Sequence, residues 1–224
     1  MTEIVDVSLA LYDNMGTFPA PTHVETELKD TGTHEEEGMA VSKLKTSTHT
    51  GTHIDSPYHF VAEGRKLDEI SPDRFIRPAV LLDFSHKEAK GGVTAAELEE
   101  KNVSIDEGDI VIIRTDWTDK MEGKSGFFME SPYLEPDAAR WLVGKNISGF
   151  GLDAGNVENP DKMDTDKAAE IHKILLGAGL IIIEGLTNLS QIPEGRHEIF
   201  ALPLKLNDCE GAPARVMIRV NEIG

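Results

Sequence analysis

The chain has 224 residues, 39% of them hydrophobic and 28% charged, which is the composition of an ordinary water-soluble domain. Its formal net charge of −18, from 40 acidic and 22 basic residues, disfavours nucleic acid as a partner because counterion release needs a basic face. A single cysteine, Cys209, excludes an intramolecular disulfide framework and favours a cytoplasmic location. We expect no membrane partner, because no segment approaches the roughly 20 apolar residues of a membrane span.

Segments rich in β-branched residues predict strands in chain order at 4–9, 40–47, 79–84, 109–114, 147–152, 180–184, 199–204 and 215–220. Helices are predicted at 94–101, where Thr94 and Glu97 form a capping box, at 134–143, and at 165–176. Strands and helices do not alternate one for one. The predicted fold is therefore α/β, a single domain over residues 1–224 with a mixed, partly barrel-like sheet flanked by a few helices.

A cluster of histidines follows the second predicted strand. Residues 47–60 read Ser-Thr-His-Thr-Gly-Thr-His-Ile-Asp-Ser-Pro-Tyr-His-Phe. His53, Asp55 and His59 all lie at even offsets from His49, which places the four side chains on one face of an extended chain and scatters them around a helix. On a straight strand His49 and His53 would lie about 13 Å apart, too far to share one ion. We therefore expect the chain to bend at Gly51, as a strand end that kinks into a loop.

Imidazole and carboxylate groups in this pattern predict a site for a divalent transition metal. An open coordination position would hold water, and His59 is then a candidate general acid and base. Two other interpretations remain. An isolated H-x-x-x-H pair is more often a pair of surface or core histidines, and a structural zinc site is possible, although such sites prefer cysteine ligands and Cys209 has no partner nearby in the sequence.

The segment H-T-G-T-H-I-D-S-P-Y-H at 49–59 resembles the signature H-x-G-T-H-x-D-x-P-x-H of the cyclase-like metal-dependent hydrolases, a family that includes bacterial kynurenine formamidase and isatin hydrolase. Residues 6–8 resemble the family's opening D-[LIV]-[ST] strand, and residues 151–153 resemble its G-[LIV]-D strand end. The segment 172–184 is similar to the second metal-binding segment of the family. The resemblance implies a fold of the swivelling β/β/α type.

The resemblance also implies two divalent ions per subunit, zinc or manganese, with His59 as proton donor and acceptor. The implied ligands are His49, His53 and Asp55 for one ion and Asp55, His172 and Glu184 for the other. From the residues alone, the second segment is a weaker signal: a carboxylate that closes the apolar run 180–183 is costly to bury unless it is paired or metal-bound. Phe18 stands where the family has a substrate-contacting tryptophan, so it is implied as substrate-binding; its alternative is a core phenylalanine.

The implied function is metal-dependent hydrolysis of a small amide or cyclic amide, most similar to an arylformamidase that converts N-formylkynurenine to kynurenine and formate in tryptophan catabolism. Opening of a lactam, as in isatin hydrolase, is the first alternative. A cyclase or dehydratase, or a non-catalytic metal-binding protein using the same site, are the others. We expect a small-molecule amide or lactam as substrate and a homodimer or homotetramer. The stretch 119–128 is predicted to be a lid or a contact between subunits.

Overall fold

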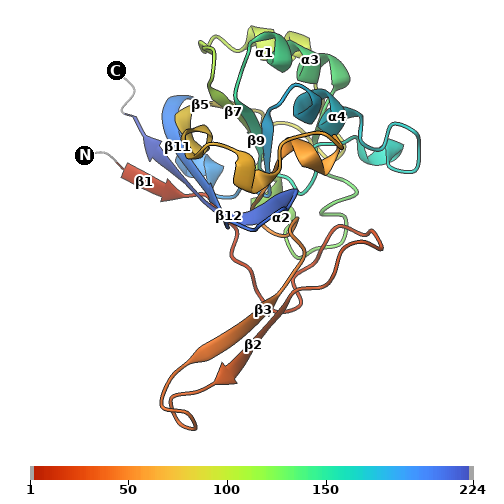
Figure 1. Cartoon of the computed structure of the whole chain (residues 1–224). Helices are drawn as coiled ribbons and strands as arrows, with labels where there is room; N and C mark the ends of the chain where they lie inside the picture. The colour runs from red at the N-terminus through yellow and green to blue at the C-terminus, as the bar shows by residue number, and fades with distance from the viewer. Residues whose placement is uncertain (1–2, 222–224) are drawn as a thin grey trace.

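The apolar segments form one mixed sheet that closes on itself. The computed structural model describes residues 3–221. Its parallel strands are, in spatial order, β5 (Ile76–Asp83), β7 (Ile110–Arg114), β9 (Gly149–Leu152) and β10 (Ile181–Glu184). Three antiparallel strands complete it: β4 (His53–Asp55), β12 (Gly211–Val220) and β11 (Gly195–Pro203). Because β4 pairs with both β10 and β12, these seven strands form a closed barrel (Figure 1). The predicted mixed sheet is confirmed, and it closes fully where the prediction was a partly barrel-like sheet. A further strand, β1 (Glu3–Asp6), pairs with β12.

The helices lie in the crossovers between the parallel strands. They are α1 (Ala95–Glu100), α2 (Trp117–Met121), α3 (Pro136–Gly144) and α4 (Glu170–Gly177), with a small parallel pair formed by β6 (Gly92–Val93) and β8 (Tyr133–Leu134). The capping box of α1 is confirmed: the Thr94 hydroxyl accepts a hydrogen bond from the Glu97 amide at 3.3 Å, and the Glu97 carboxylate accepts one from the Thr94 amide at 3.0 Å.

Strand β7 shows why the sheet carries two apolar layers. Successive side chains of a strand point to opposite faces. Val111 and Ile113 pack on one face against apolar residues of α1, α3 and α4, whereas Ile110 and Ile112 pack on the other with residues of β4, β11 and β12. Burial on both faces explains the continuous apolar run of this strand. It also makes the barrel a rigid frame for the loops at its end.

The prediction of a helix at 165–176 was wrong for residues 165–169, because α4 begins at Glu170. Thr165 makes local hydrogen bonds instead: its hydroxyl donates to the Lys162 carbonyl and accepts from the Lys167 amide. Such local bonding by threonine competes with helix formation. The helix forms where the Glu158 carboxylate accepts the amide protons of the first turn, those of Ile171 and His172.

A β-hairpin of β2 (Glu27–Gly32) and β3 (Val41–Lys45) projects away from the barrel (Figure 1). The prediction placed a strand at 40–47, but β3 pairs only with β2 and lies outside the barrel sheet. Every residue of β3 is exposed, and the cross-strand pair Leu28 and Leu44 is exposed with it. The hairpin therefore has no core of its own within the described residues.

Among residues 3–221, no helix has the length and apolar character needed to cross a bilayer.

Candidate metal centre

The histidine cluster lies where β4 joins the barrel. Gly51 has φ +63°, so the chain turns sharply between His49 and His53, which confirms the predicted kink. His53 and Asp55 are at alternate positions of β4 and share one face, while Ile54 points into the apolar core. His59 ends the short 3₁₀ helix at Pro57–His59.

The pairing of β4 with β10 brings the second segment to the first. In this antiparallel register Glu184 lies opposite His53, so the carboxylate that closes the apolar strand reaches the histidine cluster. His172 comes from α4 and is buried beside them. All six predicted polar site residues are thereby brought together: His49, His53, Asp55, His59, His172 and Glu184.

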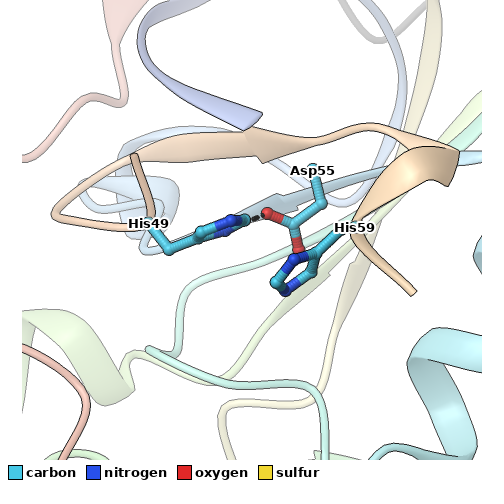
Figure 2. A group of neighbouring side chains, drawn as sticks. All are labelled: His49, Asp55 and His59. Atoms are coloured by element: carbon cyan, nitrogen blue, oxygen red, sulfur yellow. Dashed lines mark hydrogen bonds and ion pairs between the residues drawn. The ribbon is translucent and has the colours of Figure 1, made fainter. Parts of the chain in front are cut away.

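Two carboxylates lie between the imidazoles. Asp55 Oδ1 is 2.6 Å from His49 Nδ1 and 3.5 Å from His53 Nε2, and its Oδ2 is 3.6 Å from His172 Nε2. Glu184 has the same arrangement, with Oε2 at 3.4 Å from His53 Nε2 and Oε1 at 3.6 Å from His172 Nε2. Figure 2 shows the Asp55 carboxylate pointing toward the rings of both His49 and His59. Asp55 and Glu184 thus each lie between His53 and His172, and Asp55 also reaches His49.

Two imidazoles of the centre also donate a hydrogen bond from the ring nitrogen that faces away from it. His53 Nδ1 donates to the Gly51 carbonyl at 3.0 Å, and His172 Nδ1 donates to Glu158 at 2.8 Å. Such hydrogen bonds fix the tautomer and orientation of metal-binding histidines. His49 Nε2 lies 3.3 Å from Glu210 but makes no hydrogen bond within residues 3–221. Sequence reasoning missed Glu158 and Glu210, because only the fold brings them to the histidines; the signal that could have prompted a search is that a ligand histidine requires an acceptor on its second nitrogen.

The centre fits a divalent metal on the structure's own terms. Within the part of the chain that the structure describes, His53 Nε2 and Asp55 Oδ2 are buried and have no hydrogen-bond partner. Leaving a buried polar atom unpaired costs about 1–3 kcal/mol, so these atoms require a partner that the protein does not supply. Nitrogen and oxygen donors in this combination suit a divalent transition metal.

Comparison with known proteins assigns the chain to a family. A family profile described as "Putative cyclase" matches residues 5–159. The chain belongs to this cyclase family. A kynurenine formamidase from Bacillus cereus is 34% identical over 220 residues, which cover 97% of this chain and 98% of the relative.

Solved structures of similar fold include an isatin hydrolase and a protein described as a metal-dependent hydrolase. Isatin hydrolase A from Labrenzia aggregata, bound to benzyl benzoate, aligns with a TM-score of 0.89 and 27% identity over 99% of this chain and 94% of that chain. A structure described as a predicted metal-dependent hydrolase from Bacillus stearothermophilus aligns with a TM-score of 0.77 and 33% identity, over 97% of this chain and 98% of that one. The resemblance stated from the sequence is confirmed at the level of family and fold.

In this member of the cyclase family, burial and neighbouring charge have opposite effects on the pKa values of Asp55 and His172. Desolvation raises the pKa of Asp55, but the neighbouring His49 and the hydrogen bonds from His172 and His49 outweigh it and hold the pKa well below its usual value. Desolvation lowers the pKa of His172, yet its carboxylate neighbours raise it well above the usual value. Against the opposing effect of burial, the pKa of His49 is likewise raised, to about 10, mainly by Asp55. Without metal, the carboxylates therefore favour protonated His49 and His172, so positive charge is favoured at these two positions.

A cavity of about 270 Å³ opens beside the centre. It is lined by side chains of the polar cluster and by aromatic and sulfur-containing side chains, including Phe18, Phe127, Phe128 and Met163. The Phe18 ring is 5.8 Å from the Phe128 ring in an edge-on arrangement. Phe18 is thus on the cavity wall and not in the core, and the stretch 119–128 contributes Phe127 and Phe128 to the same wall.

Proposed function

We propose that this protein is a metal-dependent hydrolase of small amides attached to an aromatic ring, most similar to an arylformamidase. The observation that carries the proposal is the convergence of three imidazoles and two carboxylates, with His59 beside them, on one cavity that has an aromatic wall. The kynurenine formamidase relatives, which match this chain over nearly its whole length, support the assignment to amide hydrolysis in tryptophan catabolism.

We propose two zinc or manganese ions per chain. His49, His53 and Asp55 would hold one, and Asp55, His172 and Glu184 would hold the other. When bound, such ions supply a Lewis acid that polarises a carbonyl group and a lowered pKa for water, the nucleophile of hydrolysis.

The remaining work falls to the chain's own side chains. The His59 imidazole stacks on His49, with ring centroids 3.9 Å apart, and lines the cavity. From there it takes a proton from the attacking water and passes it to the departing amide nitrogen. Phe18 and Phe128, which lie edge-on to each other on the cavity wall, would pack against the aromatic ring of the substrate. The largely apolar wall excludes water from the acyl group.

Opening of an aromatic lactam is the second candidate function. It is favoured by the close structural match to isatin hydrolase A, and it cleaves the same kind of bond, an amide beside an aromatic ring. The two reactions differ in their products: a formyl arylamide yields formate and an arylamine, whereas a lactam yields one ring-opened acid.

The test is a comparison of substrates and variants. We expect the metal-loaded protein to hydrolyse an N-formyl arylamine or isatin. The summed mass of the products should exceed the mass of the substrate by one water. His59→Ala should keep its metal and lose about 10²–10⁴-fold in turnover, and Phe18→Ala should raise KM more than it lowers kcat. Full metal occupancy with no hydrolysis of either substrate would instead favour a non-catalytic metal-binding protein. A product of lower mass by one water would favour the dehydratase alternative.

We further propose that residues 1–224 act as one domain in the cytoplasm and assemble as a homodimer or homotetramer. The single cysteine supports the location. The projecting hairpin of β2 and β3 supports assembly, because Leu28, Val41 and Leu44 are exposed on a two-stranded element, and such an element is marginally stable alone.

A further inference from the structure

His23 is a histidine of the cavity wall to which the proposed reaction gives no part. It lies in the loop between β1 and β2, is half-buried, and lines the cavity. Within residues 3–221, the groups that lie close enough together to share a metal ion do not include it. The ring is therefore on the cavity wall without being one of the candidate ligands, where a bound molecule can contact it.

The backbone around His23 holds the ring in place. The His23 amide donates to the Ala20 carbonyl at 3.0 Å, which closes a tight turn. The next amide, that of Val24, donates to the Ser47 hydroxyl at 2.8 Å, two residues before His49. The loop is thus tied to the segment that carries the candidate metal-binding histidines.

The His23 ring neighbours both the aromatic wall and the metal centre. Its centroid is 5.8 Å from that of the Phe18 ring and 6.3 Å from that of the His49 ring. A substrate whose aromatic ring packs on Phe18 and whose amide reaches the centre therefore passes next to His23. In an aryl amide the ortho carbon lies between the ring and the amide, so an ortho substituent is the part of the substrate that is nearest to His23.

One nitrogen of the His23 ring is available to such a substituent. Nδ1 lies 3.2 Å from the Thr22 hydroxyl, and Nε2 makes no hydrogen bond in the part of the chain that the structure describes. A hydroxyl both donates and accepts, so the contact with Thr22 leaves Nε2 able to carry the proton of a neutral ring, and a protonated ring carries one there as well. None of the described residues that line the cavity is a lysine or an arginine. An uncharged carbonyl oxygen therefore suits this wall better than a carboxylate.

We propose that His23 is a specificity-determining residue, which donates from Nε2 to a carbonyl oxygen in the ortho position on the aromatic ring of the substrate. The substrate class is then an aryl amide with an ortho carbonyl group. The inference rests on the proposed function, because the aromatic wall and the metal centre are what place the substrate beside His23.

The experiment uses the full chain, loaded with zinc, and two ligands of similar shape. These are ortho-aminoacetophenone and ortho-ethylaniline, of which only the first has an ortho carbonyl oxygen. Their dissociation constants are measured by calorimetry for wild type, His23→Phe and His23→Gln. His23→Phe keeps an aromatic ring beside Phe18 and removes both ring nitrogens, whereas His23→Gln keeps a hydrogen-bond donor. The matched control is His34→Phe, the same substitution at an exposed histidine between β2 and β3.

We expect the ratio of the two dissociation constants to favour ortho-aminoacetophenone about 3–10-fold more in wild type than in His23→Phe, the range for one neutral hydrogen bond. His23→Gln should restore part of this preference, and His34→Phe should match wild type. His23→Phe should keep the zinc content of wild type, because the ring is not a ligand.

An equal ratio in wild type and His23→Phe would overturn the inference, as would binding of neither ligand to wild type. The same change of ratio in His34→Phe, or loss of zinc from His23→Phe, would also contradict it. None of these measurements requires turnover. A protein that shows the expected preference and hydrolyses no aryl amide or lactam would contradict the proposed function and leave the role of His23 standing. Hydrolysis of formanilide together with an unchanged ratio would do the reverse.

Discussion

At the scale of single residues, Asp55 connects the histidines of the first segment, His49 and His53, to His172 of the second. It is fully buried, and its two oxygens face different imidazoles, His49 and His53 on one side and His172 on the other. A buried carboxylate is costly unless it is paired. In the folded chain this cost is offset only when positive charge is held around Asp55, which ties the local fold to metal binding.

Glu158 should matter for stability as well as for the metal. Its carboxylate accepts from the amides of Ile171 and His172 and from His172 Nδ1. Glu158→Ala leaves these buried donors without an acceptor, so we expect a loss of about 1–3 kcal/mol in the free energy of unfolding. Thermal unfolding of the metal-free protein measures it. An unchanged Tm would mean that Glu158 does not hold α4 in place.

Gly211 should not tolerate a methyl group. In Gly211→Ala the new Cβ would lie 2.8 Å from the Ile54 carbonyl oxygen and 2.9 Å from His49, so backbone or ring must shift. We expect lower stability and weaker zinc binding than wild type. Gly144→Ala is the matched control, because a Cβ there meets nothing within 4 Å. Equal behaviour of the two variants would show that the His49 ring is not confined.

At the scale of elements, Asp153 ties the end of β9 to the loop that enters α2. Its carboxylate accepts from the amide and hydroxyl of Thr115 and from the amide of Asp116. Burial is the largest influence on it and raises its pKa to about 7, against the hydrogen bonds that favour the charged form.

The pH dependence of stability follows from that shift. Because the pKa of Asp153 is higher in the folded chain than its ordinary value of 3.8, the folded state binds the proton more tightly. Its contribution to stability is therefore full below pH about 4, falls as the pH rises to about 7, and is constant above that. Denaturant unfolding of metal-free wild type and Asp153→Asn across this range should show that the free energy of unfolding of wild type, minus that of the variant, falls as the pH rises. A constant difference would refute the assignment.

Elements also show what the sequence could predict. The shared face of His53 and Asp55 and the kink at Gly51 depend on local properties of the chain, so both were predicted correctly. The approach of Glu184 to His53 depends on the register of β10 with β4, a long-range pairing that no local pattern specifies. From the residues alone His172 and Glu184 were a weak signal, and the resemblance to a family is what made them predicted ligands. Glu158 and Glu210 were not predicted at all.

The hairpin of β2 and β3 allows a direct test of assembly. We expect Leu28→Ser combined with Leu44→Ser to shift the protein toward monomer in light scattering, because this exposed pair would be covered by a second copy. Val24→Ser changes an exposed apolar residue outside the two strands and is the control. A wild-type protein that is already monomeric would contradict the proposed assembly.

At the scale of the whole molecule, closure of the barrel creates the site. β12, near the end of the chain, pairs with β4 and delivers Glu210 and Gly211 to the histidine segment, while β10 delivers Glu184. The predicted mixed, partly barrel-like α/β fold was correct, but sequence alone did not show that the sheet closes through a strand as short as His53–Asp55.

Metal should therefore stabilise the whole fold. Zinc at about 100 times its Kd adds about 2.7 kcal/mol per site, which corresponds to a rise in Tm of about 5–10 °C for a domain of this size. We expect this rise in wild type and its loss in Asp55→Asn. An equal rise in both proteins would place the stabilising zinc elsewhere.

Reconstitution of the metal-free protein tests the central claim most directly. Zn²⁺ or Mn²⁺ is titrated into wild type and Asp55→Ala while hydrolysis of an N-formyl arylamine is followed by product mass. The account predicts no turnover without metal, turnover in wild type that rises until two ions are bound per chain, and none in Asp55→Ala at any metal concentration. Wild-type turnover by metal-free Asp55→Ala would contradict it.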